Sequence, residues 1–96
     1  DYYSTDEPHY DEMIRRHKQL TERTGFVGGA WKWTGFIPHN RYSIQAGKAA
    51  LAACKKNRVD SVTITCWGDD GAEASAFSVL PTFFADAQIA YGSSNQ

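Results

Sequence analysis

The sequence predicts an α/β fold built around a parallel sheet, and two observations predict it. Segments with the apolar spacing of helices alternate with short strand-like segments, in the order helix, strand, helix, strand, helix. The stretches between them have ordinary loop lengths, without repeats or low-complexity blocks. Strands that alternate with helices of this size indicate βαβ units. At 96 residues, the chain is expected to be one segment, residues 1–96, without an internal boundary.

The first helix is expected over residues 5–24. Thr5 or Asp6 is a suitable cap, Pro8 falls in the first turn, and Gly25 suits the position after the helix end. The apolar face repeats at the spacing of one side of a helix and comprises Tyr10, Met13, Ile14, His17 and Leu20.

The first complete strand is expected over residues 26–33. Gly28 and Gly29 form strands poorly, so they indicate a bend or a close approach of another group. Trp31 and Trp33 lie two residues apart and would point to the same face of a strand. Trp31 would lie deeper and could simply fill the interior. The opening residues 1–4 are expected to end a further strand.

The remaining elements have clearer patterns. Residues 41–57 predict a helix whose buried face carries Ile44, Gly47, Leu51 and Cys54. Residues 61–67 alternate apolar and polar side chains as a strand does, and Leu80-Pro81 begins the last helix because proline is tolerated near a first turn. Two strands leave unpaired edges. The sequence therefore predicts either a piece of a larger α/β protein or a chain that assembles with copies of itself.

Composition excludes several classes of partner. The net charge is −1 and basic residues are scattered, so neither a nucleic-acid nor a membrane-surface partner is expected. No apolar run approaches the roughly 18 residues that span a bilayer. Cys54 and Cys66 are expected to be free thiols, which with no visible signal peptide favours a cytoplasmic location. No spacing of ligating residues predicts a metal site, and no motif predicts a cofactor.

Aromatic and acidic residues gather where the predicted strands end. In α/β barrels the active site forms at the carboxyl ends of the strands. Here those ends are residues 1–6, 31–40 and 66–73, and indole rings beside carboxylates suit a carbohydrate. Asp69 could bind sugar hydroxyls, form an acid/base pair with Glu73, or, with Asp70, cap the next helix or turn.

Three stretches, "DYYSTDEPHYDEMIRRHKQL", "GFVGGAWKWTGFIPHN" and "VTITCWGDDGAEASAFSVLPTF", together resemble the last third of the catalytic barrel in family 20 glycoside hydrolases. These are β-N-acetylhexosaminidases, and the nearest likeness is to β-N-acetylglucosaminidases of the streptococcal, Gram-positive type. The likeness covers nearly the whole chain, and "WGDDGAE" and "GGAWKW" are its most specific parts. It implies a fragment of a (β/α)8 TIM barrel, from about helix 6 to helix 8 with parallel strands 7 and 8.

The resemblance also implies a reaction, the substrate-assisted, retaining removal of terminal β-linked N-acetylglucosamine or N-acetylgalactosamine. By position, Tyr3 would hydrogen-bond the acetamide, with Tyr2 as the alternative. Trp33 would form the pocket floor beside Trp31. The family's catalytic Asp-Glu pair would precede residue 1, so the isolated chain is expected to be inactive.

The resemblance further implies that Trp67 would line the sugar and Asp69 would bind its hydroxyls. The expected partners are a carbohydrate with a terminal β-N-acetylhexosamine, and the rest of the barrel or another copy of the chain. Two other readings stay open, a self-standing carbohydrate-binding module and a small self-associating α/β domain without catalysis.

Overall fold

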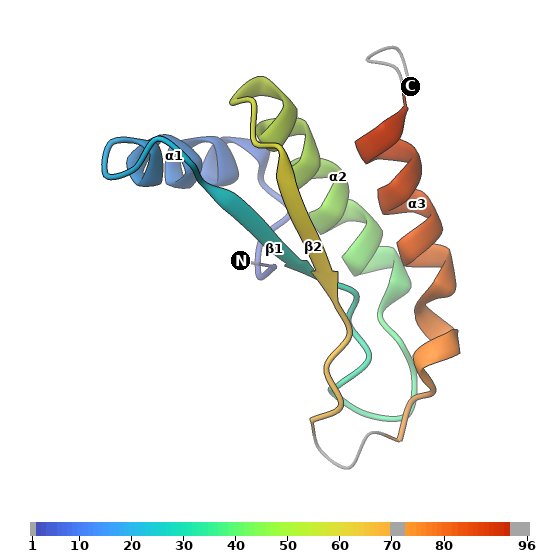
Figure 1. Ribbon diagram of the computed structural model, residues 1–96. Helices are drawn as coiled ribbons and strands as arrows, with labels where there is room; N and C mark the ends of the chain where they lie inside the picture. Colours follow the sequence, from blue (N-terminus) through green and yellow to red (C-terminus); the bar gives the residue numbers. More distant parts are fainter. Residues whose placement is uncertain (1, 70–72, 93–96) are drawn as a thin grey trace.

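A computed structural model describes residues 2–69 and 73–92. These residues form three α-helices, two strands and a short 3-10 helix, whose arrangement is drawn in Figure 1. In order these are α1 (Glu7–Lys18), β1 (Gly25–Gly29), α2 (Asn40–Lys56), β2 (Ser61–Thr65), η1 (Ala76–Val79) and α3 (Leu80–Tyr91). The predicted α/β class and the predicted order of elements are confirmed.

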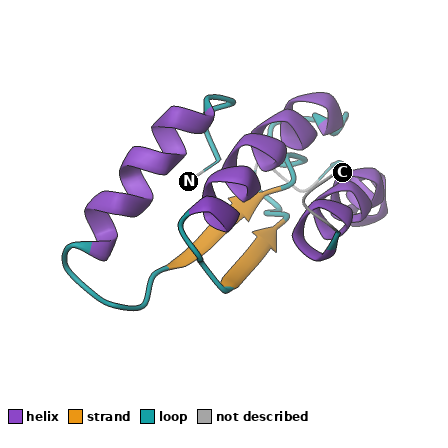
Figure 2. Ribbon diagram, turned by 90° about the horizontal axis from the view of Figure 1, so that it is seen from above, coloured by secondary structure: helices purple, strands orange, loops and turns teal. Residues whose placement is uncertain are grey.

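The two strands form a parallel sheet. Gly25 lies opposite Ser61, and the pairing runs in register to Gly29 opposite Thr65. The amide of Ala30 then donates to the carbonyl of Thr65 at 2.7 Å, which extends the ladder by one bond. Because α2 connects β1 to β2, the three elements form the predicted βαβ unit. Figure 2 shows α2 lying over the sheet, with α1 and α3 on either side of it.

The core lies where α1, α2 and β1 meet. Tyr10 and Ile14 of α1 pack against Phe26 of β1, and the Tyr10 and Phe26 rings meet edge to face at 5.9 Å. Small residues let α2 approach closely, because Ala50 and Ala53 are buried in the same cluster. The predicted inner face of α2 is confirmed at Gly47, Leu51 and Cys54, which are buried, whereas Ile44 is only half-buried.

Helix α1 is shorter than predicted. It ends at Lys18, so Gly25 does not follow a helix end but begins β1. The side chain of Thr21 accepts from the amide of Arg23 and donates to the carbonyl of the same residue, and such local bonds compete with a helix. Leu20 lies beyond the helix and is 87% exposed.

Both strands are also shorter than predicted, ending at Gly29 and Thr65. Trp31 leaves the ladder because its backbone bonds to another element. Its amide donates to Ser43 Oγ at 2.8 Å, and its carbonyl accepts from the amide of His39 at 2.8 Å. Residues 2–4 are not a strand either, since the Ser4 amide donates to the phenol of Tyr10 rather than to a neighbouring strand.

The other two helices agree better with their predicted positions. Helix α2 matches its predicted range to within one residue at each end, and α3 begins at Leu80 as expected. Cys54 and Cys66 are free thiols, the former buried and the latter half-buried. Within the described ranges, no helix is both long and apolar enough to cross a membrane.

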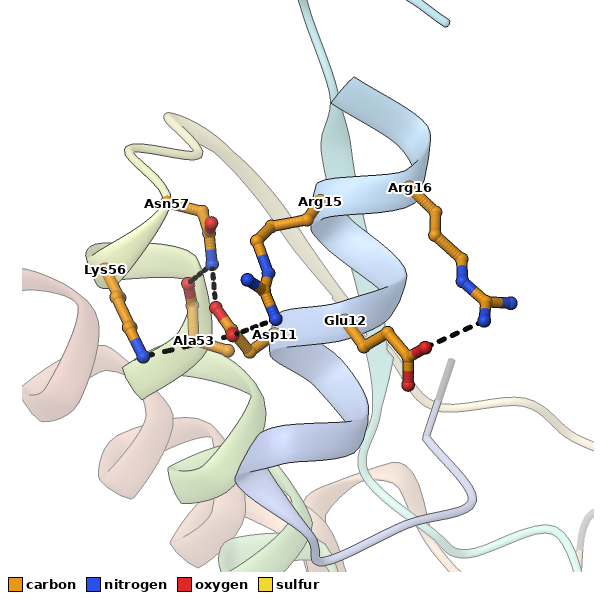
Figure 3. Close-up of polar contacts among 7 residues, drawn as sticks. All are labelled: Asp11, Glu12, Arg15, Arg16, Ala53, Lys56 and Asn57. Carbon is orange, nitrogen blue, oxygen red and sulfur yellow. Dashed lines mark hydrogen bonds and ion pairs between the residues drawn. The ribbon is translucent and has the colours of Figure 1, made fainter. Parts of the chain in front are cut away.

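One polar cluster ties α1 to the end of α2 (Figure 3). The carboxylate of Asp11 accepts from Asn57 Nδ2 at 2.7 Å. It also pairs with Arg15 at 3.1 Å and with Lys56 at 3.9 Å. The hydrogen bond from Asn57, aided by the two cations, lowers the pKa of Asp11 below its ordinary 3.8. The ionised form of Asp11 therefore stabilises the packing of α1 on α2.

Asp11→Asn is expected to lower the melting temperature at pH 7, because the charged bonds between the helices are lost. The lowered pKa means that the wild-type contribution is complete above pH 3.8 and disappears as the pH falls through that lowered value. Thermal unfolding followed by circular dichroism at pH 7 and pH 2.5 checks this.

Glu12→Gln is the matched control. Glu12 pairs with Arg16 at 2.7 Å, but both side chains are more than half exposed, and exposed pairs of this kind contribute little. Equal effects of the two substitutions at pH 7 would contradict the role given to Asp11.

Candidate functional site

An aromatic cluster lies at the carboxyl end of β1 and consists of Tyr2, Tyr3, Trp31, Trp33 and Tyr42. Trp31 and Trp33 stack at 4.7 Å with 28° between their planes. Tyr2 meets both rings edge-on, at 6.1 Å and 5.3 Å, and Tyr3 meets Trp31 edge-on at 5.1 Å. The structure thus brings together four predicted site residues from two separate stretches of the chain.

Gly29 gives the cluster its close fit to β1. A Cβ at this position would lie 2.9 Å from Trp33 Cη2 and 2.9 Å from Tyr2 Cγ, which is closer than carbon atoms pack. Tyr2 is fixed from the other side, because Trp31 Nε1 donates to its carbonyl at 3.1 Å. The predicted close approach at this glycine is confirmed, and the approaching groups are the rings of the site.

The first turn of α2 holds Trp31 in place. Ser43 is fully buried, and its hydroxyl accepts from the Trp31 amide while donating to the carbonyl of His39 at 2.7 Å. Tyr42 contacts Trp31 edge-on at 5.4 Å, and the ring of His39 lies 6.4 Å from it. Sequence reasoning missed Tyr42 and Ser43. The available signal was their place at the helix start that follows the carboxyl end of β1.

Burial within the tryptophan pair is the reverse of the prediction. Trp33 is 6% exposed, whereas Trp31 is half-buried and Tyr3 is 68% exposed. The reason is that neither residue lies in the strand, so position along a strand does not set depth. Trp33 lies beneath Gly29 and Tyr2, while the Trp31 side chain is held at the surface between Tyr3 and Tyr42. Trp33 is suited to form a floor, and Trp31 and Tyr3 offer rings that a sugar can stack on.

Trp67 and Asp69 follow β2 at the same end of the sheet, because parallel strands end at a common edge. Trp67 is 49% exposed and Asp69 is exposed. Within residues 2–69 and 73–92, Trp67 makes no ring contact with the aromatic cluster. The two residues therefore share the cluster's end of the sheet without being packed into the cluster.

The described acidic residues of the loop after β2 do not cap the helix that follows. The N-cap of η1 is Ser75, whose hydroxyl accepts from the amide of Phe77 at 3.2 Å. Asp69 is therefore not the cap of the next helix, and Asp70 and the turn that would follow it lie outside the described residues. Glu73 is described and exposed.

Metal ligation is not suggested by the geometry. No group of three His, Cys, Asp or Glu side chains in the described part of the chain is arranged to hold a metal ion. The aromatic cluster offers rings for stacking, and Asp69, which follows β2 at the same end of the sheet, offers a carboxylate that accepts hydrogen bonds.

No protein-family model matches the chain, and no curated protein sequence matches it either.

Proposed function

We propose that this chain is part of the catalytic barrel of a β-N-acetylhexosaminidase, spanning about helix 6 to helix 8. The parallel β1–α2–β2 unit with flanking helices is the arrangement that such a barrel repeats. The resemblance of "GGAWKW" and "WGDDGAE" to family 20 glycoside hydrolases supports the same assignment.

The observation that carries this proposal is the position of the aromatic cluster. Its rings gather at the carboxyl end of the parallel strands, which is the end where barrel enzymes form their active sites. Trp33 forms a buried floor beneath Trp31, and the exposed Tyr3 meets Trp31 edge-on. In this proposal Trp33 contacts the acetamide and sugar face, and the Tyr3 hydroxyl bonds the acetamide oxygen.

Trp67 and Asp69 supply the wall on the neighbouring strand. An exposed indole offers an apolar face to the sugar C–H groups, and an exposed carboxylate accepts hydrogen bonds from its hydroxyls. The acetamide carbonyl of the substrate attacks its own anomeric carbon, while an Asp-Glu pair from outside this chain orients the acetamide and protonates the leaving oxygen.

The sheet also favours a larger assembly. Of the strands in residues 2–69 and 73–92, β1 and β2 pair only with each other. Val27 and Val62 on them are 48% and 37% exposed, although valine in a barrel strand is usually covered. The rest of a barrel, or another copy of the chain, would cover these residues. The free thiols Cys54 and Cys66 favour a reducing compartment such as the cytoplasm.

Hydrolysis of an aryl β-N-acetylglucosaminide tests the proposal. The isolated chain is expected to show no turnover, whereas a longer polypeptide that contains it and an upstream Asp-Glu pair is expected to be active. In that polypeptide, Asp69→Asn should lower kcat/KM about 10-fold or more, because charged hydrogen bonds are worth about 1.5–3 kcal/mol.

Glu73→Gln is the control, since this exposed carboxylate lies on the same loop. An equal loss in both variants would favour an Asp69–Glu73 acid/base pair instead. Turnover by the isolated chain would disprove the fragment assignment. Binding of N-acetylglucosamine by the isolated chain, with no hydrolysis by the longer polypeptide, would indicate a carbohydrate-binding module.

A further inference from the structure

A cavity outside the aromatic cluster lies between α2, β2 and α3. It has a volume of about 390 Å³ and is lined by the end of α2, by β2 with the two residues before it, and by α3 from Phe83 onward. This volume falls at the small end of the range of small-molecule sites. Its walls are mainly apolar and include Leu51, Val62, Ile64 and Phe83.

Asp86 of α3 is the unusual member of this lining. Its side chain is 4% exposed, and Oδ1 is buried without a hydrogen-bond partner. The carboxyl group lies against Gly47 of α2, where any Cβ would overlap Oδ1. Burial raises the pKa of Asp86 to about 6. At neutral pH it is therefore an ionised carboxylate without a partner, which a folded protein tolerates only at a cost in stability.

The other ionisable groups around the cavity do not neutralise Asp86. From α2, the ammonium of Lys55 donates to the carbonyl of Gly92 at 3.2 Å, and burial raises the pKa of the Cys54 thiol to about 11, so this thiol stays neutral. Asp60 precedes β2 and is exposed, and Tyr91 at the end of α3 is 92% exposed. With two carboxylates and one ammonium, the lining carries a net negative charge at neutral pH.

We propose that this cavity binds a small organic cation, an ammonium group on a short apolar stem. The ammonium donates to the buried carboxylate of Asp86, and the stem packs against Leu51 and Phe83. A ligand of this kind places a positive charge beside the unpartnered carboxyl group and covers apolar surface at once. The site is separate from the proposed sugar contacts, because Trp33, Trp67 and Asp69 are not among the residues that line it.

Titration of the chain with n-butylammonium chloride at pH 7.5, followed by amide chemical shifts, tests the proposal. Saturable shifts are expected at the residues around the cavity and not around the aromatic cluster. Asp86→Asn should weaken the apparent affinity about 10-fold or more, since a charged hydrogen bond is lost. This variant removes an unpaired charge, so it is expected to fold at least as well as the wild type.

Two comparisons separate specific binding from adsorption to apolar surface. n-Butanol has the same stem without the charge and should bind at least 10-fold more weakly than n-butylammonium. Wild-type affinity should fall between pH 7.5 and pH 5, as Asp86 takes up its proton. The proposal is overturned if n-butylammonium produces no saturable shifts, if n-butanol binds equally well, or if Asp86→Asn leaves the affinity unchanged.

Discussion

Replacing Trp33 by alanine is expected to destabilise the chain by about 3–5 kcal/mol, the usual cost of removing a buried tryptophan. The side chain is 6% exposed, stacks on Trp31 and meets the ring of Tyr2 edge-on. It also fills the space against Gly29, so its removal leaves a cavity that the glycine cannot fill. Urea unfolding followed by far-ultraviolet circular dichroism measures the loss.

Trp67→Ala is the matched control for this prediction. Trp67 follows the neighbouring strand but is 49% exposed, and its loss should change the free energy of unfolding by about 1 kcal/mol or less. A similar loss in the two variants would show that Trp33 is not the packed floor of the aromatic cluster. In a longer, active polypeptide, Trp67→Ala should still weaken substrate binding, because the proposed role of this ring is contact with sugar.

Asp86→Asn is expected to stabilise the chain relative to wild type at pH 7.5 and to have a much smaller effect at pH 3.5. The buried carboxyl has its pKa raised from 3.8 to about 6. Wild-type stability is therefore highest, with respect to this group, below pH 3.8 and falls as the pH rises through about 6. This rise in pKa corresponds to a fall of about 3 kcal/mol in the free energy of unfolding between a pH well below 3.8 and a pH well above 6.

The difference between Asp86→Asn and wild type isolates this effect from the other titrating groups. Denaturant unfolding of both proteins at several values between pH 3.5 and pH 7.5 gives that difference directly. Asp60→Asn is the control, because Asp60 lines the same cavity but is exposed, and its substitution should change the free energy of unfolding little. A pH-independent difference for Asp86→Asn would contradict the assignment of an unpaired, buried carboxylate.

The elements themselves could be predicted from local pattern. The small, apolar face of α2 and the proline near the start of α3 gave the right helices almost to the residue. The ends of α1 and β1 could not be predicted in the same way. At these ends the backbone amides bond to side chains instead of continuing the element. The hydroxyl of Thr21 accepts from a backbone amide beyond α1, and the hydroxyl of Ser43 accepts from one beyond β1.

Most residues of the candidate site were also evident from the sequence, but their arrangement was not. Trp33 and Trp67 follow the ends of β1 and β2, which a periodic pattern locates, whereas no described strand precedes Tyr3. Which tryptophan is buried depends on the loop after Gly29, where strand alternation no longer applies. Asp86 gave no signal at all, because an acidic residue within a helix is normally solvated.

The sequence by itself determined the α/β order, the parallel βαβ unit and the end of the sheet where aromatic and acidic residues gather. These features follow from the periodicity of single segments, which is local, and from the rule that parallel strands end at one edge, which depends only on topology. Only the tertiary structure decided that Tyr2 and Trp33 close over Gly29, and that Asp86 is buried against Gly47. Such contacts join residues far apart in the chain, and they depend on the close approach of helices and strands that no single segment encodes.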